Sequence, residues 1–317
     1  MNRKLLIVSA AALWAATVGA QTAASAPALP APAWAPPAGL VTMPIWPSTP
    51  PDSKPNPQPE VNENASGERK IEGHPVIYLG NVSTPTITVY PPKGKNTGAA
   101  VVVFPGGAYR ILAIDLEGTE VCDWLTQIGV NCVLLKYRVP NSGPYPKSAA
   151  ALQDAQRAVG LVRQHAAEWG IDPHRVGVLG FSAGAHLSAA ISTHYDKRLY
   201  DPIDAADQQS CRPDFAVVLY PGYLAMADRN FAANSDINPT ADTPPTFILQ
   251  AENDYQAHVE SSVVYFMQLK SVKVPAELHI YAEGGHGFGL RSGDLPILGW
   301  PKLVETRLHT IKMLAPE

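Results

Sequence analysis

Residues 175–192 read RVGVLGFSAGAHLSAAIS, and this stretch indicates the fold class of the chain. The run that ends at Phe181 is apolar and rich in valine, as is typical of a strand buried on both faces. Small, helix-compatible residues follow Ser182 directly. Gly180 and Gly184 stand two places before and after the serine, where side chains would collide in a tight strand-to-helix turn. We therefore predict a strand, a tight turn and a helix, with Ser182 at the turn.

Strands and helices alternate along the chain from about Pro75 onward. Apolar or alternating runs predict strands at residues 86–90, 99–104, 132–137, 175–181, 215–220, 246–250 and 277–281. Amphipathic segments predict further helices at residues 118–128, 147–169 and 301–313. This alternation predicts an α/β fold with a doubly wound, mostly parallel sheet. Ligands bind such sheets at the carboxyl ends of the strands, which is where the turn at Ser182 would lie.

A serine hydroxyl is a weak nucleophile at neutral pH and needs a general base. His286 suits this role best of the nine histidines, because it lies in the glycine-rich stretch EGGHGFG at residues 283–289. A loop between the last strand and the last helix can place the imidazole over the carboxyl edge of the sheet. His186 stands on the helix after the serine and points away from the reacting side, so we expect a structural role. His258 suits a rim or capping position better.

An acid must fix the tautomer of the base and stabilise its protonated form. Asp254 lies four residues after the strand predicted at 246–250 and 32 residues before His286. The chain order serine, aspartate, histidine is the one that accompanies this kind of nucleophile turn. Asp254 is therefore the predicted acid, and Glu252 remains the alternative.

The segment FPGGAY at residues 104–109 follows another predicted strand. A pair of glycines lets backbone N–H groups turn inward, where they can stabilise the negative oxygen of a transition state. The predicted N–H donors are Gly107 and Ala183, with Ala108 or Gly106 as a third. The segment between Tyr220 and Pro244 is short for a lid, which predicts an open site for a short acyl group. Candidates for contact with the substrate are Tyr109, Arg110 and Trp300, although core packing is an equally good expectation for Trp300.

The first twenty residues have the pattern of a secretory signal peptide. Arg3 and Lys4 precede an uncharged apolar run at residues 5–18, and the small residues Val18-Gly19-Ala20 follow. We therefore expect a periplasmic or secreted protein. Residues 27–60 hold 12 of the 31 prolines, so we predict that residues 21–65 form an extended arm or linker. The catalytic domain is then expected to span residues 66–317.

The composition excludes several classes of function. The chain has 317 residues, 46% of them hydrophobic, which is enough for one large core, and its net charge is −4. Nucleic acid and anionic membrane surfaces are therefore not expected as partners. No histidine–acid spacing of the H-E-x-x-H kind is present, so we expect neither a metal nor another cofactor. The three cysteines Cys122, Cys132 and Cys211 are best interpreted as buried thiols; an export route permits one disulfide, but the sequence does not select a pair.

These features resemble the α/β-hydrolase superfamily and, more narrowly, its bacterial acetyl xylan esterase-like branch, which is related to the hormone-sensitive-lipase type. The stretches that carry the resemblance are Pro105–Tyr109, Glu117-Gly118, Trp124-Leu125, 136–140 (KYRVP), 154–158 (DAQRA), 172–177 (DPHRVG) and 299–301 (GWP). Ala108, Ala185 and Ala251 depart from glycines that are common in these relatives. The resemblance implies deacetylation of xylan or related acetylated sugars through a Ser-His-Asp triad and an acyl-enzyme.

Other functions stay open at this point. A feruloyl esterase or a general short-chain carboxylesterase would use the same residues. A serine exopeptidase is less favoured, because the chain lacks the added propeller or large cap that such enzymes usually carry. A binding module without activity is disfavoured by the complete set of Ser182, Asp254, His286 and the glycine pair.

Overall fold

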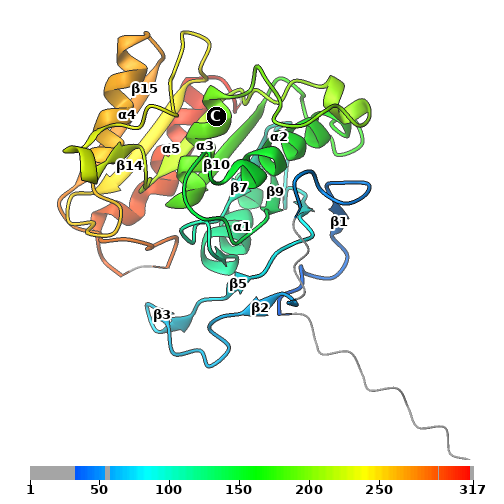
Figure 1. Ribbon diagram of the computed structural model, residues 1–317, viewed down its shortest axis with the longest axis horizontal. Helices are drawn as coiled ribbons and strands as arrows, with labels where there is room; N and C mark the ends of the chain where they lie inside the picture. The colour runs from blue at the N-terminus through cyan, green and yellow to red at the C-terminus, as the bar shows by residue number, and fades with distance from the viewer. Residues whose placement is uncertain (1–32, 54–57, 292, 315–317) are drawn as a thin grey trace, which may run out of the picture. The chain divides into compact units, whose positions relative to one another are not determined.

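The computed structural model describes residues 33–53, 58–291 and 293–314, which belong to one compact unit. An eight-stranded sheet lies in its middle, with helices on both faces (Figure 1). In spatial order the strands are β1 (Val41–Pro44), β6 (Thr86–Tyr90), β9 (Asn131–Lys136), β7 (Ala100–Phe104), β10 (Val176–Phe181), β11 (Ala216–Leu219), β14 (Thr246–Ala251) and β15 (Ala276–Tyr281). All neighbours from β9 to β15 are parallel, whereas β1–β6 and β6–β9 are antiparallel. The predicted doubly wound, mostly parallel α/β fold is confirmed.

Five α-helices are found in the described part of the chain: α1 (Glu120–Gln127), α2 (Ala149–Gln164), α3 (Ala183–Thr193), α4 (Glu260–Ser271) and α5 (Trp300–Thr310). The chain steps from β7 to β9 in one direction and from β9 to β10 in the other. Because such crossovers are right-handed, α1 and α2 lie on opposite faces of the sheet. Trp124 of α1 packs edge-on against Trp300 of α5 at 5.0 Å, so these two helices share a face. Helix α2 ends earlier than the predicted residue 169, since residues 165–170 form a turn that closes at Gly170 with φ of 66°.

Short strands form small sheets outside the central one. They are β2 (Val61–Asn62), β5 (Tyr78–Gly80) and β8 (Leu112–Ala113) in one sheet, β3 (Lys70–Ile71) with β4 (His74–Pro75), and β12 (Ala225–Met226) with β13 (Ala232–Ala233). The strand β8 directly follows the loop at residues 105–111, so the β2–β5–β8 sheet is joined to the carboxyl edge of the central sheet.

Part of the segment for which an arm or linker is predicted lies on the compact unit. Strand β1 extends the central sheet, and Ile45 and Trp46 beside it are buried. The indole N–H of Trp46 donates to Asp154 of α2 at 2.8 Å. The compact unit therefore begins well before the predicted domain boundary at residue 66. The signal peptide predicted for residues 1–20 lies outside the described residues.

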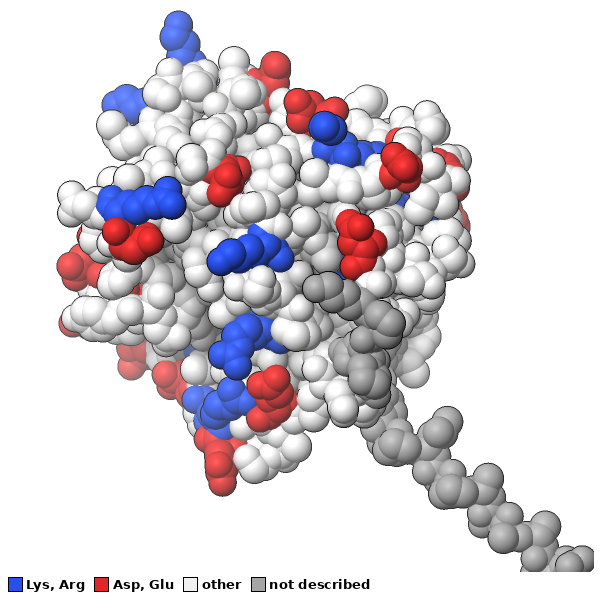
Figure 2. All heavy atoms as spheres, viewed as in Figure 1, with Lys and Arg blue, Asp and Glu red and all other residues white. Residues whose placement is uncertain are grey.

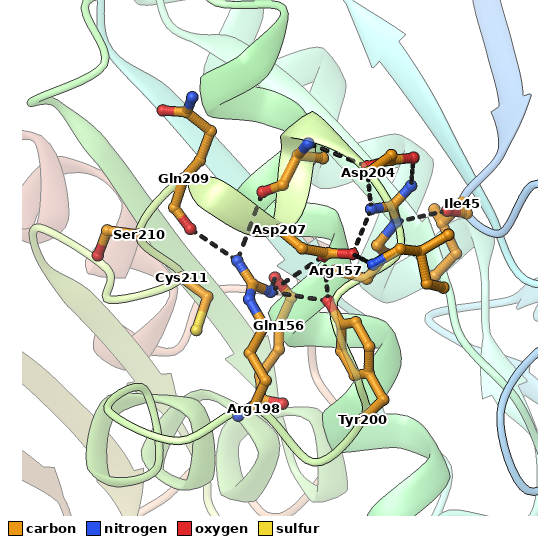
Figure 3. Close-up of polar contacts among 12 residues, drawn as sticks. Ile45, Gln156, Arg157, Arg198, Tyr200, Asp204, Asp207, Gln209, Ser210 and Cys211 are labelled. Carbon is orange, nitrogen blue, oxygen red and sulfur yellow. Dashed lines mark hydrogen bonds and ion pairs between the residues drawn. The ribbon is translucent and has the colours of Figure 1, made fainter.

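A buried cluster of charges fastens the segment after α3 onto α2. Figure 3 shows Arg157 of α2 pointing toward Asp204 and Asp207, which it pairs with at 2.5 and 2.9 Å. The Tyr200 hydroxyl donates to Asp207 at 2.7 Å, and Arg157 also donates to the carbonyl of Ile45 at 2.9 Å. Burial opposes ionisation of Asp207, but hydrogen bonds from the Ile203 N–H, Tyr200 and Arg157 outweigh it and lower its pKa. The cluster therefore ties three chain segments together.

Two of the three cysteines differ from the prediction. Cys122 on α1 and Cys132 on β9 form a disulfide, so the interpretation of both as buried thiols is wrong. Helix α1 packs next to the strand that follows it, which brings the two side chains together across one turn. Cys211 is a free, buried thiol that donates to the carbonyl of Tyr195 at 3.2 Å.

None of the helices in the described part of the chain has both the length and the apolar character that a membrane span needs. Acidic and basic side chains are interspersed on the face in Figure 2, without one continuous basic patch among the described residues there.

Candidate active site

Ser182 lies between the end of β10 and the start of α3, as the sequence predicts. Its backbone has φ of 52° and ψ of −115°, a conformation that is strained for a residue with a side chain. A Cβ at Gly180 would collide with the carbonyl of Gly184, and a Cβ at Gly184 would collide with the carbonyl of Phe104. The two glycines are therefore required by close backbone approach. This turn raises the serine side chain above the carboxyl edge of the sheet.

The structure brings Ser182, His286 and Asp254 together in one chain of hydrogen bonds. The Ser182 Oγ lies 2.9 Å from Nε2 of His286, and the Nδ1 of His286 lies 2.7 Å from Oδ2 of Asp254. The carboxylate can only accept, so Nδ1 carries the proton and Nε2 is left free to accept from the serine. Asn253 accepts the N–H of Gly285 at 2.8 Å and so ties the loop of the acid to the loop of the histidine.

Asp254 is 1% exposed, yet its carboxylate is well provided with donors. Its Oδ1 accepts the N–H groups of Gln256 at 3.0 Å and Ala257 at 2.9 Å, and Gln250 lies 3.3 Å from Oδ2. These contacts fix the carboxylate so that Oδ2 faces the imidazole. The alternative acid, Glu252, is exposed at the surface, and only its backbone N–H has a bond in this loop, to Tyr281. The geometry therefore favours Asp254 over Glu252.

Two chain segments beside Ser182 carry the backbone N–H groups expected for an oxyanion site. Gly107 and Ala108 have φ of 134° and 55°, and both line the same cleft as the serine. Ala183 is the first residue of α3, where helical geometry leaves the N–H without a partner. In the described structure the N–H groups of Gly107, Ala108 and Ala183 have no protein acceptor. The N–H of Gly106 donates instead to Glu117 at 2.6 Å, so it is not available to a ligand.

Glu117 lines the cleft, and the sequence alone indicates no chemical role for it. It lies on a π-helical turn, Asp115–Thr119, and is 4% exposed. Its Oε2 accepts from Gly106, and its Oε1 accepts the Tyr220 hydroxyl at 2.9 Å. Burial raises the pKa of the Glu117 carboxyl, although the nearby His286 and these two hydrogen bonds oppose the shift. The only sequence signal was the Glu117-Gly118 pair within the resemblance.

Tyr109 does not contact the cleft, and the prediction that it binds substrate is wrong. Its φ of 60° turns the side chain into the core, where it is fully buried. The hydroxyl lies 2.7 Å from Nδ1 of His186, and the ring packs near Tyr137 and stacks on Tyr223. Burial lowers the pKa of His186 to about 3, so this histidine is neutral and structural, as expected. Trp300 is also fully buried and donates to a backbone carbonyl, which leaves Arg110 as the predicted contact residue that reaches the cleft.

The cleft around Ser182 has a volume of about 400 Å³, which is within the usual range for small-molecule sites. Its lining residues are Glu63, Arg69, Ile71, Tyr78, Gly107, Ala108, Arg110, Ile111, Ala113, Leu116, Glu117, Ser182, Gln256, His286 and Gly287. One wall comes from the chain between β2 and β5, where the Arg69 guanidinium lies 4.3 Å above the ring of Tyr78. The described residues contain no cluster of histidine, cysteine or acidic side chains suited to a metal ion.

Several known proteins with similar sequences are named as esterases or ester hydrolases. The family model BD-FAE matches residues 87–228. An acetylxylan esterase of Xylanibacter ruminicola is 30% identical over 216 residues, which is 61% of this chain and 42% of that protein. A probable carboxylic ester hydrolase, LipM, of Mycobacterium tuberculosis is 30% identical over 214 residues, which is 59% of this chain and 48% of that protein. The chain thus spans less than half the length of these two curated relatives.

One solved structure covers nearly all of the described unit. It is an acetyl ester-xyloside bifunctional hydrolase from Caldicellulosiruptor lactoaceticus, with 31% sequence identity and a TM-score of 0.66. The match covers 87% of this chain and 97% of that one. The chain belongs to the α/β-hydrolase superfamily, in the branch of serine-type carboxylic ester hydrolases.

Proposed function

We propose that this protein hydrolyses carboxylic esters with Ser182 as nucleophile, His286 as general base and Asp254 as the acid that orients the base. The observation that carries the proposal is the unbroken chain from Ser182 Oγ to His286 Nε2 at 2.9 Å and from His286 Nδ1 to Asp254 at 2.7 Å. Ser182 and His286 of this hydrogen-bonded chain line the cleft, where an ester carbonyl can reach the serine.

The reaction proceeds in two steps. Ser182 Oγ attacks the carbonyl carbon and passes its proton to Nε2 of His286, while the carbonyl oxygen becomes negative. The N–H groups of Gly107, Ala108 and Ala183 are positioned to stabilise that oxygen, and the N-terminus of α3 adds a favourable dipole. The bond to the alcohol then breaks, and the alcohol leaves with the proton from His286. In the second step His286 takes a proton from water and the resulting hydroxide attacks the acyl-enzyme. The bond to Ser182 Oγ then breaks, His286 returns the proton to Oγ, and the acid is released.

The substrate that we favour is an acetyl ester of xylan or of a related sugar. One observation supports this choice: a relative and a similar structure are named as an acetylxylan esterase and an acetyl ester-xyloside hydrolase. A feruloyl esterase or a general short-chain carboxylesterase would use the same machinery. Measuring acetate release from acetylated xylan beside hydrolysis of methyl ferulate separates these substrates, and preference for the ferulate would refute the acetyl assignment.

The variant Ser182→Ala tests the activity itself. It should lose hydrolysis of an aryl acetate by at least about a thousandfold while its circular dichroism spectrum and thermal midpoint stay native. Retained turnover in a folded Ser182→Ala protein would exclude this serine as the nucleophile.

We also propose that the protein is exported. The charge and hydropathy pattern of residues 1–20 supports export, and so does the Cys122–Cys132 disulfide, because such bonds persist in oxidising compartments. N-terminal sequencing of protein from the periplasm and the medium should find a mature chain that begins near residue 21. An intact Met1 on protein recovered from the cytoplasm alone would refute export.

A further inference from the structure

We propose that a second hollow beside the catalytic cleft is a subsite for the glycan part of the substrate, where it holds sugar units next to the esterified one. This inference rests on the proposed function. The hollow has a volume of about 550 Å³, and four chain segments line it: residues 52–53, 81–83, 138–142 and 147–150. Nothing in the two-step ester reaction requires it, so its presence needs another explanation.

The hollow and the cleft are lined by adjoining segments of the chain. Strands β7 and β9 are parallel neighbours, so the loops that follow them leave the same edge of the sheet. Asn141, which lines the hollow, donates its N–H to the carbonyl of Tyr109 at 2.7 Å, and the next residue, Arg110, lines the cleft. On the other side, a Cβ at Gly80 would touch Glu63 and Ile111 of the cleft, and the next residue, Asn81, lines the hollow. A chain of sugars leaving the cleft can therefore continue into the hollow.

The lining of the hollow suits a hydroxyl-rich ligand without net charge. Its amide and hydroxyl side chains, which can both donate and accept hydrogen bonds, are Ser53, Asn81, Ser83, Asn141 and Ser142. Of the two cations in the lining, Arg138 is paired with the buried Asp154, and Lys147 is offset by the exposed Asp52. The apolar residues of the lining are Val82, Val139, Pro140, Ala149 and Ala150, which can pack against the carbon faces of sugar rings. Closely spaced hydrogen-bonding groups around a wide hollow fit sugar hydroxyls better than they fit an acyl chain or an aromatic group.

A buried guanidinium at the base of the hollow holds its walls in place. Arg138 is 6% exposed and pairs with Asp154 at 2.8 Å. It also donates to the carbonyl of Pro51 at 2.6 Å and to that of Ala150 at 3.0 Å, so it links two of the lining segments to its own. The Gln153 amide donates to Asp52 at 2.7 Å, and this second contact also holds the lining segment at residues 52–53 in place. The hollow is thus preformed, and binding a ligand requires little further ordering.

The test fills the hollow and compares substrates of different size. Ser83 and Ser142 are exposed residues that line the hollow and not the catalytic cleft, so the double variant Ser83→Trp/Ser142→Trp blocks the hollow alone. The control Ser271→Trp adds a tryptophan at an exposed serine at the end of α4, near the opposite edge of the sheet. Each protein is assayed with an aryl acetate and with acetylated xylo-oligosaccharides of increasing length.

We expect the double variant to hydrolyse the aryl acetate within twofold of the wild-type rate, while kcat/KM for long oligosaccharides falls at least tenfold, mainly through KM. Binding is measured separately by titrating deacetylated xylohexaose into Ser182→Ala with and without the two tryptophans, and the tryptophans should weaken it at least tenfold. The subsite would be overturned if wild-type protein had equal kcat/KM for short and long acetylated substrates, or if the two tryptophans left the binding of xylohexaose to Ser182→Ala unchanged. If the wild-type protein did not hydrolyse the aryl acetate at all, the proposed function itself would be refuted, so the two failures are distinguishable.

Discussion

Replacing Glu117 tests how the oxyanion loop is held. Glu117→Leu leaves two groups without an acceptor in a buried position, the N–H of Gly106 at 2.6 Å and the hydroxyl of Tyr220 at 2.9 Å. Each buried polar group left unpaired costs about 1–3 kcal/mol, so the free energy of unfolding should fall by about 2–6 kcal/mol. Displacing one oxyanion donor costs about 10²–10³ in kcat, and this range is the upper limit for the effect on turnover.

Glu117→Gln is the matched control, because it keeps a carbonyl oxygen for Gly106 and places an amide beside the Tyr220 hydroxyl. It should retain kcat within about tenfold of wild type, since both hydrogen bonds can still form. The assay is kcat and KM on an aryl acetate between pH 5 and 9, with urea unfolding of each variant. A folded Glu117→Leu protein with full kcat would refute a positioning role for Glu117. If kcat fell as much in Glu117→Gln as in Glu117→Leu, the negative charge of Glu117 would matter and not its role as a hydrogen-bond acceptor.

Three further predictions follow from other parts of the structure. Asp254→Asn should lower kcat by about 10³–10⁴ with little change in KM, because Asn can donate to Nδ1 and so favour the wrong tautomer; steady-state kinetics with near-wild-type kcat would contradict this role. Arg157→Ala should cost about 1.5–3 kcal/mol in urea unfolding, because it removes the closer of the two guanidinium partners of the buried Asp207 and leaves Arg198 at 3.5 Å. Asp204 and Asp207 have lowered pKa values in the folded state. The stability that they contribute is therefore complete above the unfolded pKa of aspartate and is lost as pH falls through their folded pKa values. The free energy of unfolding of the wild type should thus fall more steeply on acidification than that of Arg157→Ala, and parallel curves of stability against pH would contradict this. Cys122→Ser/Cys132→Ser should lower the free energy of unfolding by about 2–3 kcal/mol without changing kcat, and a native urea midpoint would contradict the stabilising role of the disulfide.

The sheet and the position of the serine could be predicted because both depend on local patterns. The apolar runs at residues 99–104 and 175–181 predict strands in the middle of the sheet, where β7 and β10 are found. The glycines around Ser182 report a close backbone approach that any tight strand-to-helix turn needs. A histidine and an aspartate on loops after later strands then share one edge, because the carboxyl ends of parallel strands lie together.

Other features depend on tertiary contacts that no local pattern encodes. The segment around Tyr109 is glycine-rich and predicts a turn, but the side of the sheet to which the tyrosine points depends on positive φ angles at residues 107–109 and on the space beside His186. Glu117 looks like an ordinary surface acid in the sequence, and only its buried contacts reveal its position. Strand β1 lies in a proline-rich stretch that disfavours strands, yet an edge strand needs few backbone donors and tolerates Pro44 at its end.

The central claim is that Ser182 is activated by the hydrogen-bonded chain through His286 and Asp254. A direct measurement is the reaction of the protein with a fluorophosphonate, followed by intact-mass and peptide analysis. We predict one adduct, located on Ser182, that forms much more slowly in Asp254→Asn and is absent from Ser182→Ala. An active protein that acquires no adduct, or that carries its adduct on another residue, would contradict the claim.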